Sequence, residues 1–191
     1  MADTVLWTII GIIGLISIYI IIVFNSLVRE RNQAKAAWSS IEVFLKRRHE
    51  LIPNLVETVK GYAKHESSTL EKVIAARNEA MRQASGAEEN HSAAENMLSK
   101  SLKSIFALSE SYPDLKANQN FIELQRDITD AEDKIQASRR FYNSVVLVFN
   151  NRTETFPSKI IAGMCNFRKF AFFELDEEEK EAVYKPVQYK I

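Results

Sequence analysis

The sequence has few of the residues that cross-link a chain or break a helix. Cys165 is the only cysteine among 191 residues, which excludes an internal disulfide and any paired-cysteine metal or redox motif. Five glycines and four prolines are also few, so long uninterrupted helices are favoured over an all-β fold. The length allows one sizeable domain together with an anchor.

A surplus of charge of one sign is also missing, since 25 basic residues are balanced by 25 acidic ones. Contacts between basic side chains and phosphates supply much of the affinity for nucleic acids, so a chain without a basic surplus is a poor candidate for binding them. We therefore expect no nucleic acid among the partners.

Residues 5–24 form a run of 20 residues without any charge. In a helix such a run spans about 30 Å, the thickness of the hydrocarbon core of a bilayer. The alternative, a cleaved signal peptide, fits poorly because no Lys or Arg precedes the run and no small-residue cleavage site follows Phe24. We expect a retained single-pass transmembrane helix, with the lipid bilayer as a partner.

The flanks of this run predict its orientation. Arg29, Arg31 and Lys35 follow it closely, whereas residues 1–4 contain neither Lys nor Arg. The positive-inside rule then places the short N-terminus, residues 1–4, outside the cell and the C-terminal domain in the cytoplasm.

Beyond the run, apolar residues recur at alternating steps of three and four, which is typical of helices packed along one face. Arg48 interrupts the first series, and the series keeps its phase through Pro53. Because proline lacks an N–H and clashes with the preceding turn, the pattern predicts one kinked helix or two stacked helices, with a bend near Arg48 and His49. The members are Trp38, Ile41, Leu45, Ile52, Leu55, Val59 and Tyr62.

Two further helices are expected between residues 68 and 111. The first begins with a capping box of Ser68 and Glu71 and ends at Ser85 and Gly86. The second covers residues 87–111 and is stopped by Pro113. Their apolar series are Leu70, Ile74, Arg77, Met81 and Ala84, and then Ala94, Leu98, Leu102, Ile105, Leu108 and Tyr112.

The longest helix is expected to begin near Asn118, with Asp114 or Asn118 as its N-cap. Its strict heptad series is typical of coiled-coil-like packing. The charged residues beside the series, Glu132 and Arg139 among them, are expected to face solvent. The series consists of Phe121, Leu124, Ile128, Ala131, Ile135, Ser138, Tyr142, Val145 and Phe149.

These patterns predict an all-α fold. An N-terminal transmembrane helix, residues 5–24, leads into an antiparallel bundle of long helices, residues 25–156. A short helix that begins at Pro157 or Ser158 and an aromatic and acidic tail complete residues 157–191.

Several motifs along the chain together resemble the LemA family of bacterial membrane proteins. They are the Arg31-Asn32 and Ala37-Trp38 pairs and residues 47–66, 75–80, 112–128, 137–150, 156–157 and 172–174. The resemblance implies a mostly helical protein anchored in a bacterial cell membrane, and it implies no enzymatic activity. One departure lies at Cys165-Asn166-Phe167, where a glycine ahead of the phenylalanine is expected, and it concerns the local turn.

Arg48 is the most unusual residue of the first apolar series, because its phase points it into the helix interface. Either its side chain reaches out to solvent, or it is buried and paired with a carboxylate from another helix. For the second case we expect Glu123 as the partner, since it lies beside the heptad series. Such a pair sets the register between helices more than it adds stability.

Other polar residues within the family-like motifs are expected to have structural roles. Asn54, Asn143 and Asn150 are expected to cap helices or to form hydrogen bonds between them. Tyr112 and Pro113 mark the stop of one helix and the turn to the next. Cys165 is expected to be a small packed side chain.

The aromatic tail has more than one interpretation. Phe167, Phe170, Phe172 and Phe173 either pack on the bundle as a lid or lie on the membrane or a neighbouring subunit, where Arg168 and Lys169 would suit anionic headgroups. The acidic run of residues 176–181 would be repelled by such a surface, so we favour packing on protein.

No catalytic, metal or cofactor site is predicted. His49-Glu50 begins like the HExxH motif of zinc proteases, but Pro53 occupies the position of the second histidine. The three histidines, His49, His65 and His91, are spread over three expected helices. We expect no cofactor.

Two functions of different classes fit these features. The first is a non-enzymatic scaffold that associates with copies of itself and organises the membrane, with Phe170, Phe172 and Phe173 as a contact surface. The second is an adaptor or regulatory partner of another membrane protein, such as a protease or a transporter.

Overall fold

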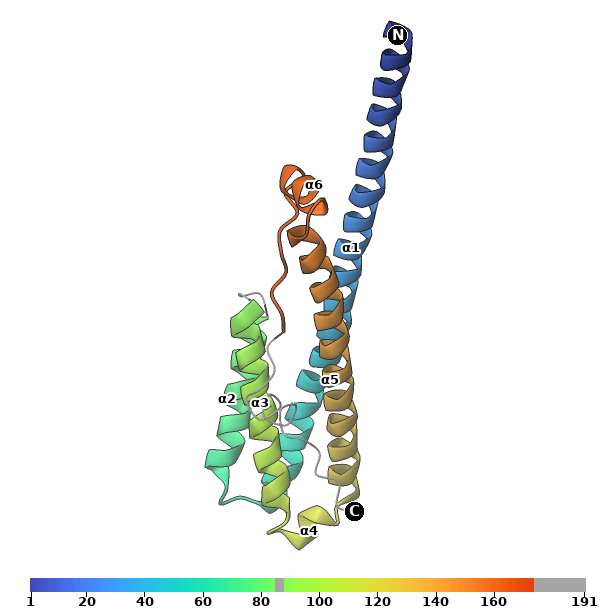
Figure 1. Ribbon diagram of the computed structural model, residues 1–191. Coiled ribbons are helices and arrows are strands. Elements are labelled where there is room, and N and C mark those ends of the chain that lie inside the picture. Colours follow the sequence, from blue (N-terminus) through green and yellow to red (C-terminus); the bar gives the residue numbers. More distant parts are fainter. Residues whose placement is uncertain (85–87, 174–191) are drawn as a thin grey trace, which may run out of the picture. The chain divides into compact units, whose positions relative to one another are not determined.

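The computed structural model describes the backbone of residues 1–84 and 88–173, and the side chains of these residues except 88–90. Every regular element in these ranges is a helix, which confirms the all-α class (Figure 1). The elements are α1 (Ala2–Tyr62), α2 (Ser67–Gln83), α3 (Glu88–Ser109), α4 (Pro113–Lys116), α5 (Gln119–Glu154) and α6 (Ser158–Met164).

The chain divides into two compact units. Unit 1 contains residues 1–39 and 140–170, and unit 2 contains the described residues of 40–139 together with residues 171–173. The helices α1 and α5 therefore each contribute one part to unit 1 and another part to unit 2.

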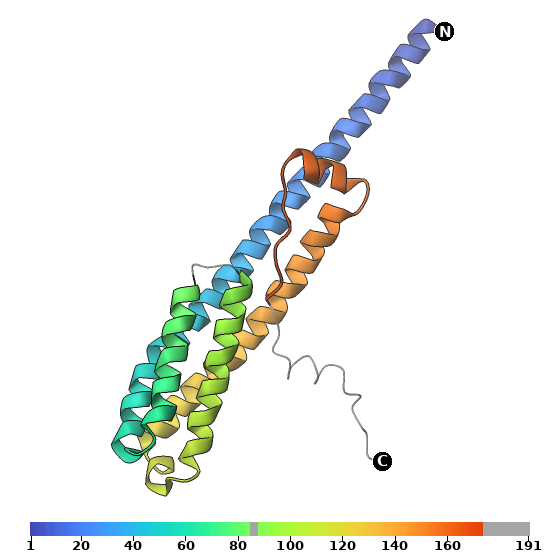
Figure 2. The ribbon, with the colours of Figure 1, turned by 90° about the vertical axis from the view of Figure 1, so that its left-hand side faces the viewer.

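In unit 2, α2 and α3 lie side by side and antiparallel against the parts of α1 and α5 that belong to this unit (Figure 2). Burial of apolar side chains along these helices supplies the main stabilisation of the unit. The core includes Ile52, Leu55, Val59, Leu98, Leu102, Ile105, Phe121 and Ile128.

In unit 1, the end of α5 and α6 pack against α1 just after its apolar run. Leu27, Phe149, Ile161 and Ala162 form the core, and Val23, Phe167 and Phe170 pack against it. In both views α6 lies beside α1, and α1 continues past it alone to the N-terminus (Figures 1 and 2).

The predicted apolar series of α1 and α5 are confirmed in large part. The helix α1 passes through Pro53 without interruption, so the alternative of two stacked helices is wrong. Along α5, Phe121, Ile128, Tyr142 and Phe149 are all buried, as the heptad series predicts.

The predicted face of α2 is wrong apart from Leu70, which is buried as expected. The helix buries Leu70, Val73, Ala76 and Ala80, while Ile74 and Met81 of the predicted series are exposed. No capping box forms either, because Glu66 occupies the N-cap position and no side chain bonds to the N-terminal N–H groups. The helix ends at Gln83, and the predicted stop at Ser85 and Gly86 lies outside the described residues.

The turns around α4 and α6 follow ordinary capping chemistry. Asn118 caps α5, because its Oδ1 accepts a hydrogen bond from the backbone N–H of Phe121 at 3.0 Å. After α6, Asn166 has a φ of 55°, and the N–H of Phe167 donates to the carbonyl of Ala162 at 2.9 Å. This is the left-handed helix end in which glycine is usual and asparagine is tolerated. Asn166, which lies where the resemblance leads us to expect glycine, thus takes a conformation for which glycine is suited.

Candidate functional site

A buried cluster of charged side chains lies inside unit 2. Arg48 of α1 is fully buried and forms ion pairs with Glu95 of α3 and Glu132 of α5. Its Nη1 also donates to the hydroxyl of Ser99 at 2.7 Å. We name Arg48, Glu95, Ser99 and Glu132 the Arg48 cluster. Its ion pairs connect three helices of the unit.

The three charged members of the cluster lie on the packed faces of their helices. Arg48 replaces an apolar residue in the α1 series, and the α3 series continued backwards from Leu98 reaches Glu95 and then His91. Along α5 a second series of steps of three and four shares Ile128, Ile135, Tyr142 and Phe149 with the predicted series. Its remaining members include Glu132 and Arg139. It consists of Ile128, Glu132, Ile135, Arg139, Tyr142, Val146 and Phe149.

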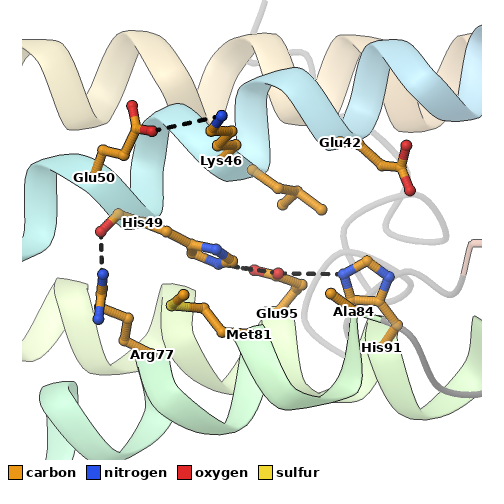
Figure 3. A pocket seen from close by; sticks show the side chains of 10 residues that line it. Glu42, Lys46, His49, Glu50, Arg77, Met81, Ala84, His91 and Glu95 are labelled. Carbon is orange, nitrogen blue, oxygen red and sulfur yellow. Dashed lines mark hydrogen bonds and ion pairs between the residues drawn. The ribbon is translucent and has the colours of Figure 1, made fainter.

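Two histidines converge on the buried carboxylate of Glu95 (Figure 3). The Nε2 atoms of His49 and His91 lie 3.1 Å and 3.3 Å from its Oε1. Burial acts to raise the pKa of Glu95, but hydrogen bonds from His49 and His91 and the charge of Arg48 outweigh burial and hold the pKa well below its ordinary value. The carboxylate therefore stays ionised, and it acts as an acceptor rather than as a proton donor.

Arg77 of α2 compensates for Pro53. Proline has no N–H with which to form the helical hydrogen bond to the carbonyl four residues earlier, which belongs to His49. In the structure the Nε of Arg77 donates to this carbonyl at 2.8 Å, as the left side of Figure 3 shows. Pro53 thus makes a backbone acceptor available, through which α2 is attached to α1.

A pocket of about 370 Å³ opens beside Glu95. Such a volume is near the lower limit for a small-molecule site. The pKa of Glu95 is shifted away from neutrality, so this carboxylate is not suited to act as a general acid or base near neutral pH. Among the described residues no three His, Cys, Asp or Glu side chains are placed to hold a metal ion. The lining consists of Glu42, Leu45, Lys46, His49, Glu50, Arg77, Met81, Ala84, His91 and Glu95.

The structure confirms the buried alternative for Arg48 and corrects its partner. Glu123 is exposed and accepts a hydrogen bond from Gln119 at 3.0 Å, because its position on α5 faces away from the core. Two of the three histidines, predicted to be spread over three helices, lie close to one another. His49 and His91 share one carboxylate, while His65 lies in the turn between α1 and α2.

Arg139 and Glu132 were both predicted to face solvent, and the structure contradicts this. Arg139 is buried, donates to Oδ1 of Asn96 at 3.0 Å, and has its guanidinium carbon 4.2 Å from the centre of the Phe173 ring. Glu132 is the half-buried partner of Arg48. The signal that could have found them is the second series along α5, which widens the buried face of that helix.

The asparagines differ in their surroundings. Asn150 is buried, and its side-chain amide forms two hydrogen bonds with the backbone of Phe170, at 2.9 Å and 3.1 Å. Asn143 is half-buried. Asn54 is exposed.

The residues of the predicted stop and turn lie where the pattern places them. The Tyr112 hydroxyl donates to Oε1 of Glu66 at 3.4 Å, and exposed Pro113 begins α4.

The described part of the aromatic tail packs on the chain itself. In unit 1, the Phe149 ring centre lies 6.3 Å from that of Phe167 and 5.3 Å from that of Phe170. In unit 2, Phe173 is buried, whereas Phe172 remains exposed. Cys165 is exposed, so its predicted packing is wrong. The acidic run at residues 176–181 lies outside the described residues.

Comparison with known proteins gives a consistent result. The model of the LemA family matches residues 37–187. A similar protein is Protein LemA of Metamycoplasma hominis, which is 28% identical over 159 residues, or 82% of this chain and 71% of that protein.

Proposed function

The chain belongs to the LemA family, and we propose that it is a non-enzymatic, membrane-anchored scaffold that associates with copies of itself. The helix α1 is long and apolar enough to cross a membrane, with a mean hydropathy of 2.7 over its most apolar part, none of which is buried. Arg29, Arg31 and Lys35 after this part favour a cytoplasmic location for the remainder of the chain.

The observation that carries the proposal is an apolar stripe on the outer surface of α5 in unit 1. Phe141 and Val148 are 53% and 54% exposed, and Leu147 beside them is 50% exposed. Together with Ser144 they recur at steps of three and four, the spacing with which helices pack on one another. A groove of about 260 Å³ runs along this stripe and is lined by Glu30, Gln33, Phe141, Ser144, Val145 and Val148.

A second copy of the chain is the occupant that fits this stripe. Copies anchored in one membrane stand parallel, so a two-fold axis along the membrane normal brings identical residues to the same height. Such an interface must be complementary to itself. An apolar stripe of Phe141, Leu147 and Val148 meets this condition, whereas a face with one sign of charge would repel its copy.

The Arg48 cluster has a supporting role in this proposal. Buried ion pairs add little net stability, and their best-attested use is to fix one arrangement of helices. Connecting α1, α3 and α5 through Arg48 would fix their register, so that every copy has the same surface.

The test is the mass of the full-length protein in mild detergent, measured by light scattering with the detergent subtracted. We expect an assembly of this chain alone that becomes smaller when Phe141→Ser and Val148→Ser are combined. Ile122→Ser is the matched control, because Ile122 is an exposed apolar residue of α5 in unit 2, outside the stripe.

Two other outcomes would decide against self-association. A wild-type monomer would contradict it directly. A small species that retains a second protein in stoichiometric amount would favour the adaptor function. Replacing Phe170, Phe172 and Phe173, predicted from the sequence as a contact surface, would be a poor test, because Phe170 packs on Phe149 and Phe173 is buried.

A further inference from the structure

The position of α6 within unit 1 is fixed relative to the end of the apolar run of α1. Ile161 and Ala162 of α6 pack with Leu27, and Val23 packs against the same core. Arg152 at the end of α5 pairs with Glu30 at 2.6 Å, which ties α5 to α1 one turn further along. The apolar run ends at Phe24, so α6 lies within about one helical turn of its end.

The side of α6 that does not face this core is strongly apolar. Ile160 and Met164 lie one helical turn apart on α6 and are 56% and 83% exposed. Phe156, in the turn just before α6, is 80% exposed, and we name these three residues the α6 face. The neighbouring Lys159 and Arg168 are also exposed. Nothing in the core of unit 1 uses the α6 face.

Depth in the membrane explains this face. If residues 5–24 cross the hydrocarbon core, a helix packed on Val23 and Leu27 lies in the headgroup region, which is roughly 5–8 Å thick on each side. Apolar side chains gain free energy there by entering the boundary of the acyl chains, and basic side chains are attracted by anionic headgroups.

We propose that the α6 face is a second membrane contact, which inserts into the cytoplasmic leaflet beside the transmembrane helix. The proposal rests on the membrane anchoring in the proposed function, and it adds a lipid-binding surface at a different part of the chain. Two points of attachment would hold unit 1 at a fixed angle to the membrane, whereas a single helix leaves it free to tilt and rotate.

The depth of a nitroxide label in proteoliposomes tests this proposal. The full-length chain with Cys165→Ala receives one new cysteine at a time, and the vesicles contain phosphatidylethanolamine and phosphatidylglycerol. Met164→Cys reports on the α6 face, Ile12→Cys on the apolar run, and Ala36→Cys on an exposed position of α1 further from the membrane. Collisions with oxygen, which concentrates in lipid, are compared with collisions with a nickel chelate, which stays in water.

We expect the label at residue 12 to be deep, the label at residue 164 to favour oxygen severalfold over the chelate, and the label at residue 36 to favour the chelate. A label at residue 164 that behaves like the one at residue 36, with residue 12 deep, would overturn the α6 proposal and leave the anchor intact. Shielding of residue 164 from both probes would also overturn it, because protein would then cover the face. If residue 12 is in water as well, the anchoring itself is wrong.

Discussion

At the scale of single residues, the charge on Glu95 is the most consequential. It is fully buried and is shared between Arg48 and two histidines. Removing one partner of a buried ion pair leaves an uncompensated charge, so Glu95→Gln should destabilise the protein by about 3 kcal/mol. The check is urea unfolding of the full chain in mild detergent, monitored by circular dichroism. Glu123→Gln, at an exposed position, should change the free energy of unfolding by less than about 0.5 kcal/mol.

The pH dependence of this effect follows from the direction of the pKa shift. The folded state holds the pKa of Glu95 well below its ordinary value of 4.5, because the histidine hydrogen bonds and the charge of Arg48 outweigh burial. A lowered pKa means that the carboxylate stabilises the fold above pH 4.5, and that this contribution is lost as the pH falls from there through the folded pKa. The difference in unfolding free energy between wild type and Glu95→Gln should therefore shrink below pH 4.5. A difference that grows on acidification would contradict the assignment.

Asn166 offers a second test at this scale. Its φ of 55° is a conformation that costs an alanine about 1 kcal/mol and costs a glycine almost nothing. Asn166→Ala should lower the free energy of unfolding by roughly this amount, while Asn166→Gly should leave it unchanged or raise it slightly. The same urea titration distinguishes them, and equal effects of the two variants would argue against a left-handed residue here.

At the scale of helices, Pro53 and Arg77 form a coupled pair. In the wild type, Arg77→Met leaves the carbonyl of His49 without the donor that replaces the missing helical hydrogen bond, at a cost of about 1–2 kcal/mol. In a Pro53→Ala background the amide of residue 53 becomes available to this carbonyl, so the same change should cost less. A double-mutant cycle of unfolding free energies measures the coupling. Additive effects would show that Pro53 and Arg77 act independently.

The helices also show which parts of the fold can be predicted from sequence. The series of α1 and α5 were predictable because they are long and strictly periodic. The face of α2 was not, because Val73 and Ile74 are both β-branched and apolar, and alanines such as Ala76 and Ala80 fit either face. Packing of α2 against α3 decides between these faces, and that contact is not local in the sequence.

The site was predictable only in part, for a similar reason. Arg48 was identified because it interrupts an apolar series. Its partners were harder to find, because α5 buries a wider face than one heptad series covers, and Glu132 and Arg139 lie on the added part. Charged residues next to an apolar series look like solvent-facing residues unless a buried partner on another helix is known.

At the scale of the whole molecule, the apolar run of α1 and the basic residues after it predict the orientation of the chain in the membrane. The scaffold proposal and the α6 contact both require the N-terminus outside and the helices beyond the run inside. This orientation has a direct test, since Cys165 is the only cysteine and can be replaced. New single cysteines at Asp3 and at Ser104, which are both exposed, then report on the two sides.

A membrane-impermeant maleimide applied to intact bacterial spheroplasts should label Asp3→Cys and leave Ser104→Cys unlabelled until the membrane is permeabilised. The physical reason is the charge asymmetry, because translocating Arg29, Arg31 and Lys35 is costly and residues 1–4 carry no basic side chain. The reverse pattern would place unit 2 outside the cell and contradict a cytoplasmic scaffold. Replacing Arg29, Arg31 and Lys35 together by glutamine should weaken the orientation, so that both cysteines react partly before permeabilisation. The same triple change in a chain that bears Arg at positions 2 and 4 should invert the labelling, since the orientation then follows the charges.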